Sequence, residues 1–213
     1  FDLEYRDDDK EFHQVLGLTP LKFYHEYFDT NLSDYVVVTN APDHEMDRSY
    51  LMPAQDSVVD GLPIKFVNVP FEELQKGAIK QLQAGETVWV GNDVLQQMDR
   101  KRGLMDAKLY HREELLDVDF VMDKKHRLET KQAVVSHAMT LTGFDMVNDQ
   151  PTRWKIENSW GKDNGDNGYF VMTQDWFEEY TYEAVINKKY LSDRVKKVAD
   201  SEPVTLPAWD SLQ

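Results

Sequence analysis

Apolar and polar positions along the chain predict helices early and strands late. Apolar residues recur at helical spacing after Thr19-Pro20, a pair typical of a helix start, so residues 1–34 are expected to form a helical, polar-surfaced segment. A stronger pattern, opened by Pro70 and ended by Gly85, predicts a helix near 71–84.

Most of the predicted strands lie in the last third of the chain. Short runs rich in β-branched and aromatic residues, separated by Gly, Asn and Asp clusters, predict strands at 35–39, 64–69, 87–90, 133–144, 153–158, 169–172 and 182–187. The final residues, 191–213, are polar and carry no periodicity. We therefore expect an α+β fold with a helical segment at 1–34, a β-rich lobe at 35–190 and a C-terminal arm at 191–213.

Composition narrows the classes of function. A formal charge of −15 argues against a nucleic-acid or anionic-membrane partner, because both are polyanionic. The chain contains no cysteine, which excludes disulfides, thiolate metal sites and a thiol nucleophile supplied by these residues. With 41% hydrophobic residues in 213, there is enough apolar material for one domain or slightly more. We interpret the start at Phe1 as that of a fragment or a processed piece.

Of the six histidines, His137 has the most informative surroundings. His44 and His111 are flanked by acids and are expected to be solvated. His137 lies within a predicted strand whose alternation places it on one face with Met139 and Leu141. A single strand histidine is more often a core residue satisfied by one hydrogen bond than a catalytic group.

A second strand about twenty residues later favours the catalytic interpretation. Trp154, Ile156 and Asn158 share one face there, so a hairpin would bring the Asn158 amide beside the His137 ring. An imidazole that acts as a general base needs an acceptor at its far nitrogen, and an amide oxygen supplies one without adding charge. Trp160 would cover the pair and keep water away from it, although a lone Trp after a strand is often simply a core residue.

These motifs resemble those of a known enzyme family. Ser136-His-Ala-Met139, followed by Trp154-Lys-Ile-Glu-Asn-Ser-Trp-Gly161 and Asn167-Gly-Tyr-Phe170, is similar to the His and Asn motifs of papain-fold cysteine peptidases. More narrowly, the chain resembles the bleomycin hydrolase and bacterial aminopeptidase C family. Similar segments run in order from Thr19-Pro-Leu-Lys-Phe23 to Leu206-Pro-Ala-Trp-Asp210 and look like that family's C-terminal half.

The resemblance implies a cysteine-type aminopeptidase that removes N-terminal residues from peptides. His137 would be the base that forms the thiolate and later the acid that protonates the departing amine, and Asn158 would orient it. The Cys and the oxyanion-hole Gln would belong to the enzyme's N-terminal half, which would be the partner of this chain. Alone, the chain is expected to be inactive.

The resemblance also implies where peptides bind. Gly91, Asn92 and Ala138 would lie at the pocket for the substrate's second side chain, although Asn92 stands where the family is expected to have Cys. The C-terminal arm would lie in the cleft, and the terminal carboxylate, here that of Gln213, would meet the substrate's α-ammonium. The arm stops a little short of the family's usual end, which leaves an endopeptidase as an alternative.

Other implications concern assembly and location. The family resemblance implies a cytoplasmic homohexamer with no cofactor and no metal.

A catalytically dead peptide-binding or interaction fragment is a second alternative. The intact His and Asn argue against it. Paired-carboxylate glycoside hydrolysis is not selected by the spacing of any of the 39 acidic residues.

Overall fold

The computed structural model describes residues 1–28 and 30–212, which form two compact units, Phe1–Ser33 and Asp34–Gln213. The first unit holds strands β1 (Leu3–Arg6) and β2 (Phe12–Val15) and helix α1 (Pro20–Tyr27). Helix α1 begins as the sequence predicts, since the Thr19 hydroxyl accepts a hydrogen bond from the Lys22 N–H at 3.2 Å.

The expectation of a helical segment at 1–34 is wrong for the first fifteen residues. Strands β1 and β2 form an antiparallel hairpin in which Arg6 pairs with Phe12. The turn is closed by Asp7, whose carboxylate accepts the Glu11 N–H, and by Lys10 with a φ of 66°. Four-residue strands with mostly polar positions have too little apolar alternation to be recognised in the sequence.

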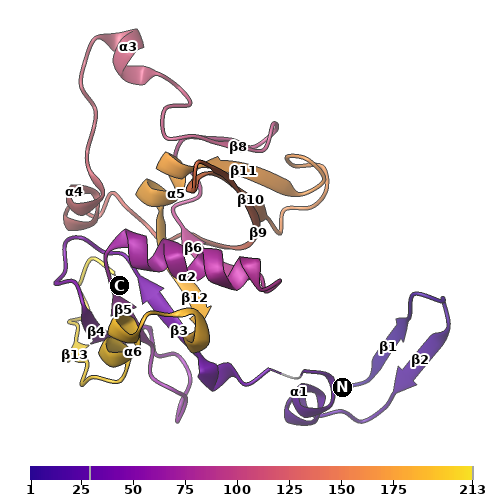
Figure 1. Cartoon of the computed structure of the whole chain (residues 1–213). Coiled ribbons are helices and arrows are strands. Elements are labelled where there is room, and N and C mark those ends of the chain that lie inside the picture. The colour runs from indigo at the N-terminus through magenta and orange to yellow at the C-terminus, as the bar shows by residue number, and fades with distance from the viewer. Residues whose placement is uncertain (29, 213) are drawn as a thin grey trace. The chain divides into compact units, whose positions relative to one another are not determined.

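The second unit is built on one mixed sheet, which contains eleven strands within the described residues (Figure 1). Their order is β13-β4-β5-β3-β12-β6-β9-β10-β11-β8-β7. The bounds are β3 Tyr35–Thr39, β4 Arg48–Leu51, β5 Lys65–Asn68, β6 Val88–Asn92, β7 Met98–Asp99, β8 Leu104–Met105, β9 His137–Val147, β10 Gln150–Glu157, β11 Tyr169–Thr173, β12 Thr181–Asn187 and β13 Val204–Thr205.

Helices and 3₁₀ turns connect these strands. They are η1 Leu32–Asp34, η2 Pro53–Gln55, α2 Phe71–Gln83, α3 Arg112–Leu116, α4 Lys124–Glu129, α5 Gln174–Tyr180, η3 Lys188–Tyr190 and α6 Asp193–Ala199. Helix α2 lies where the sequence predicts it. Helix α6 and strand β13 are additional elements in the 191–213 segment, which was expected to lack periodic structure; α6 is only seven residues long and is capped by the Ser192 hydroxyl.

The main hydrophobic core lies between α2 and the central strands, which α2 crosses in Figure 1. Leu74 and Ala78 on α2 and Val90 on β6 are fully buried in it. Helix and sheet approach closely at Gly77, where a Cβ atom would lie 2.8 Å from Ile186 Cδ1. The result is an α+β fold in which the face of the central strands opposite to α2 is not part of this core. In the part of the chain that is described, no helix has the length and apolar character needed to cross a membrane.

Candidate active site

The β9–β10 hairpin places His137 at the open end of a buried strand. Met139 and Leu141, on the same face of β9, are 3% and 0% exposed, whereas His137 is only partly buried. His137 is the first residue of β9 and is paired with Asn92 on β6. The start of the strand is held by the Ser136 N–H, which donates to the Asn92 carbonyl at 3.0 Å.

Asn158 comes directly after β10 and meets the imidazole. Its N–H donates to the Gly168 carbonyl at 3.0 Å, which fixes the backbone at this point. The distance between His137 Nε2 and Asn158 Oδ1 is 2.8 Å. The strand alternation therefore predicted this juxtaposition correctly, and the antiparallel pairing of β9 and β10 produces it.

The backbone decides which nitrogen of His137 carries the proton. Asn158 Oδ1 also accepts a hydrogen bond from the Ser159 N–H at 2.8 Å, and an N–H group can only donate. The amide oxygen, not the amide nitrogen, must therefore face both groups, so His137 Nε2 is a donor. In the neutral ring this leaves Nδ1 with a lone pair, as a general base requires.

Trp160 lies against the imidazole, as expected from its position. The two rings stack with centroids 5.0 Å apart and an interplanar angle of 29°. Phe170 meets the indole edge to face at 6.0 Å, and the Arg100 guanidinium lies 4.5 Å from the indole centroid. Asn158 is only 7% exposed, so its bond to His137 is shielded from competing water.

The residues expected to contact substrate divide into two groups. Ala138 is exposed and lies opposite Gly91 in the β6–β9 register. Asn92 is different, because its side chain is fully buried and its Oδ1 accepts a hydrogen bond from the Thr181 hydroxyl at 2.7 Å. The Asn92 side chain thus turns into the sheet and supports β12 instead of facing a ligand. Gln213 lies outside the described residues.

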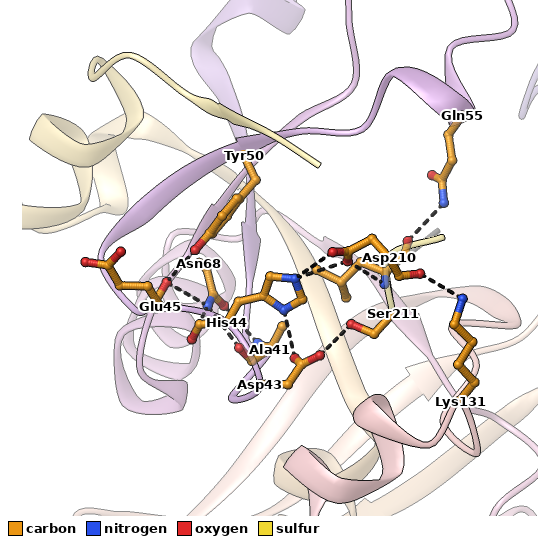
Figure 2. Close-up of polar contacts among 11 residues, drawn as sticks. Ala41, Asp43, His44, Glu45, Tyr50, Gln55, Asn68, Lys131, Asp210 and Ser211 are labelled. Atoms are coloured by element: carbon orange, nitrogen blue, oxygen red, sulfur yellow. Dashed lines mark hydrogen bonds and ion pairs between the residues drawn. The ribbon is translucent and has the colours of Figure 1, made fainter. Parts of the chain in front are cut away.

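The C-terminal segment is fastened by a cluster that the sequence did not indicate (Figure 2). His44 was expected to be solvated, yet its side chain is only 13% exposed. Its Nε2 lies 3.1 Å from Asp210 Oδ1, and its Nδ1 lies 2.9 Å from Asp43 Oδ1 in an ion pair outside hydrogen-bond geometry. Ser211 donates to Asp43, so two successive residues of the tail attach to one histidine–aspartate pair.

The same cluster sets the charge of His44. The contact with Asp43 raises the pKa of His44 above its ordinary 6.5, burial lowers it, and the bond to Asp210 raises it further; the result is a raised pKa. Burial alone would raise the pKa of Asp43, but the contacts with His44 and Ser211 outweigh burial and lower it. Both directions favour an imidazolium between two carboxylates.

Lys124 is a second residue that sequence reasoning missed. It is only 6% exposed, and its ammonium donates to Asn40 Oδ1 at 2.9 Å and to the carbonyls of Glu178 and Thr181 at 2.8 and 2.6 Å. Burial lowers its pKa to about 7, whereas three acceptors favour the charged form. Lys124 thus joins α4 to the ends of α5 and β3, a long-range role that a lysine in a charged segment does not reveal.

The His137–Asn158 pair is separate from the hollow that borders α3, α4 and α5. That hollow has a volume of about 680 Å³ and is lined by acidic residues such as Glu178 and by apolar ones such as Phe120, without His137 or Asn158. Within the described ranges, no three His, Asp or Glu side chains converge in a way that could hold a metal ion.

Comparison with known families agrees with this geometry. The model of the Peptidase C1-like family matches residues 1–213. The chain belongs to the Peptidase C1-like family. The fold is therefore papain-like, and His137 and Asn158 lie in its β-rich part.

Several relatives of this chain carry aminopeptidase names. Aminopeptidase G of Lactobacillus delbrueckii subsp. lactis and aminopeptidase E of Lactobacillus helveticus are each 53% identical to the chain, with all of this chain aligned to 48% and 49% of theirs. The crystal structure of PepW from Lactobacillus rhamnosis HN001 superposes with a TM-score of 0.93 at 41% identity, covering 100% of this chain and 49% of PepW. The chain thus spans about half the length of the relatives it matches.

Proposed function

We propose that this chain is the C-terminal part of a thiol aminopeptidase and supplies its general base. The observation that carries the proposal is the 2.8 Å bond from His137 Nε2 to Asn158 Oδ1, which directs the basic Nδ1 away from the amide. The Cys nucleophile would come from the half that the relatives possess and this chain does not align with. The names of those relatives support peptide hydrolysis from the N-terminus.

In the proposed mechanism, every proton transfer takes place at one atom, His137 Nδ1. His137 Nδ1 takes the proton from the thiol, and the thiolate attacks the carbonyl carbon of the scissile peptide bond. The tetrahedral intermediate collapses when Nδ1 returns the proton to the leaving amine, which forms a thioester with the N-terminal residue. Nδ1 then removes a proton from water, and the resulting hydroxide attacks the thioester carbonyl carbon. The C–S bond breaks, the N-terminal residue leaves with a free carboxylate group, and Nδ1 returns the proton to the sulfur.

Asn158 and Trp160 act on the imidazole, not on the substrate. Because Asn158 Oδ1 is held by the Ser159 N–H, it keeps the ring plane fixed through both protonation states of Nδ1. A neutral amide does this without the strong preference for imidazolium that a carboxylate would impose. The stacked Trp160 ring keeps water from that bond.

The test requires the complete enzyme, in which this chain is joined to a Cys-bearing half. His137→Ala is expected to lower kcat/KM for a peptide amide by a factor on the order of 10⁴, and Asn158→Ala by about 10–100-fold. The control is His111→Ala, which changes an exposed histidine. Undiminished hydrolysis by His137→Ala contradicts the assignment, and cleavage of N-acetylated peptides by the wild type contradicts the aminopeptidase specificity.

The finer parts of the proposal concern organisation of the whole enzyme. We infer a β-rich lobe at 35–190 followed by an arm at 191–213 that controls access to the cleft, with further contacts to the N-terminal half. The family resemblance also suggests a homohexamer in the cytoplasm, with peptides as substrates and neither nucleic acid nor membrane as a partner. Light scattering of the complete enzyme tests the hexamer, and a mass near that of one subunit contradicts it.

A further inference from the structure

One basic side chain from outside the β9–β10 hairpin lies against the indole that covers the bond between His137 and Asn158. Arg100 is in the turn between β7 and β8, and its guanidinium carbon lies 4.5 Å from the centroid of the Trp160 ring. Trp160 in turn stacks on His137 with centroids 5.0 Å apart. A cation above an aromatic ring is attracted by the electrons of that ring. Arg100 is therefore connected to the imidazole through the indole.

A second attachment fixes the direction of the Arg100 side chain. Its Nε–H donates to Asn164 Oδ1 at 2.6 Å, and the Asn164 amide nitrogen donates to the Trp160 carbonyl at 2.6 Å. One amide group thus links the guanidinium to the backbone of the residue whose indole the guanidinium contacts. A cation above a ring is a common contact at protein surfaces, but here it closes a set of three contacts that restricts both side chains.

The backbone at Arg100 is held against the loop that follows Asn158. The Gly165 N–H donates to the Arg100 carbonyl at 3.1 Å, and β8 pairs with β11, the strand after that loop. A Cβ atom at Gly103 would lie 2.8 Å from the Cα of Gly165, so the two backbones meet without room for side chains. The turn that carries Arg100 therefore has a fixed position beside Trp160.

The charge of Arg100 is not used in an ion pair. Arg102, in the same turn, pairs with Asp99 at 3.5 Å. Arg100 forms no ion pair with any acidic side chain that the structure describes, although the protein contains 39 acidic residues. Trp160 is only partly buried, so its stacking on the imidazole depends on few other contacts. The attraction of the guanidinium adds to that stacking.

We propose that Arg100 is a positioning residue that holds Trp160 over the imidazole and keeps water from the bond between His137 Nε2 and Asn158 Oδ1. Its role in the reaction rests on the proposed peptidase function. Arg100 acts through the indole and does not touch the substrate. When the indole moves away, water competes for Asn158 Oδ1, and the imidazole loses the partner that fixes its plane.

The rate at which the Nε2 proton of His137 exchanges with water measures this shielding. NMR with isotope-labelled histidine follows that proton in this chain at a fixed pH, without substrate. Arg100→Met keeps a long side chain but removes the cation and the Nε donor, so we expect exchange about fivefold faster. Arg100→Lys restores the cation alone and should bring the rate to within about twofold of the wild type.

The matched control is Arg102→Met, which removes one positive charge from the same turn at a side chain that is 77% exposed. It should leave the exchange rate unchanged. Trp160→Ala should raise the rate more than Arg100→Met does. Adding Arg100→Met to Trp160→Ala should then change nothing further, because the guanidinium has no indole to hold. Circular dichroism checks the fold of each variant.

Three results of the exchange experiment overturn the proposal. One is an equal rate in Arg100→Met and Arg102→Met. Another is an Arg100→Met effect that is as large without the indole as with it. The third is a wild-type rate in Trp160→Ala, because the indole then shields nothing.

Kinetics of the complete enzyme separate positioning from contact with the substrate. Arg100→Met is expected to lower kcat about twofold and to leave KM unchanged, equally for peptides that end in a carboxylate and in an amide. A rise in KM confined to the carboxylate peptides means that the guanidinium binds the substrate. That result overturns the proposal, as does an unchanged kcat.

Failure of this proposal is distinguishable from failure of the peptidase function. If the complete enzyme hydrolyses peptides and needs His137 to do so, but the exchange rate does not respond to Arg100, only the role of Arg100 is wrong. If the exchange rates follow the expected order but no peptide is cleaved, only the catalytic proposal is wrong.

Discussion

Replacing His44 by Gln is expected to loosen the C-terminal segment without disturbing the rest of the sheet. The imidazolium lies between Asp210 and Asp43, whose side chains are 13% and 5% exposed (Figure 2). Gln keeps a similar size and one hydrogen bond but removes the positive charge. Two largely buried carboxylates would then face each other without a cation between them.

The magnitude follows from the two contacts. At about 3 to 4 Å and an effective dielectric constant of about 20, each ion pair contributes about 4 kcal/mol of gross attraction. Removing the three charges from water offsets most of this, which leaves about 2 kcal/mol for the cluster. That free energy corresponds to about a 30-fold change in the population of the detached tail.

The pH dependence has a definite sign. The folded pKa of His44 is raised above 6.5, so its stabilisation is fully present below 6.5 and is lost as the pH rises through the raised value. The folded pKa of Asp43 is lowered below 3.8, so its contribution is present above 3.8 and is lost as the pH falls through the lowered value. Attachment of the tail should therefore be strongest between about pH 4 and 6.5.

Hydrogen exchange followed by mass spectrometry measures this attachment, because a terminal segment can detach without global unfolding. The reporters are backbone amides at 206–212, including Leu206, which donates to the Leu51 carbonyl at 2.9 Å. At pH 6, His44→Gln should lower their protection about 10- to 30-fold, and the difference from the wild type should shrink by pH 8. Comparing variants at each pH cancels other groups such as Lys124.

The control is His111→Gln, which replaces an exposed histidine paired with Glu114 and should leave the tail unchanged. The reasoning is refuted if His44→Gln lowers protection equally at pH 6 and pH 8. It is also refuted if wild-type protection, corrected for intrinsic exchange, rises over this interval.

Two further substitutions test the fold. Lys124→Met should lower the free energy of unfolding by about 2–4 kcal/mol because three acceptors lose their donor. The control, Lys125→Met at an exposed position, should change it by less than about 0.5 kcal/mol. Urea denaturation measures both variants, and equal effects contradict the role of Lys124. Gly161→Ala should lower the free energy of unfolding by about 1 kcal/mol because of its φ of 84° alone. Gly165→Ala should lower it clearly more, because its Cβ would lie 2.4 Å from the Tyr169 carbonyl oxygen. Similar urea midpoints for the two variants contradict this prediction.

The contact between His137 and Asn158 could be predicted because it depends on local alternation. His137 shares a period of two with Met139 and Leu141, and Asn158 shares one with Ile156, so one hairpin suffices to bring the two side chains together. Helix α2 was found for a similar reason, since its buried residues recur over a long stretch. Such patterns are contained within single elements.

The features that the sequence did not reveal depend on distant partners. His44 is enclosed by Asp210, which is 166 positions away, and Lys124 reaches Asn40 across 84 positions. Arg100 reaches Asn164 across 64 positions only because β8 and β11 are neighbours in the sheet. No local period marks such residues, and charged side chains are ordinarily expected at the surface.

The side chains of His137, Asn158 and Trp160 all come from one short stretch, 137–160, folded as a hairpin and the turn after it. A displacement of this hairpin carries imidazole, amide and indole along together, so their alignment survives motions that alter their distance to anything else. In the proposed enzyme, the distance that can still change is the one between the sulfur of the Cys and Nδ1 of His137. Catalytic activity would then be controlled by how the two halves of the enzyme pack together and not by the orientation of the His137 ring.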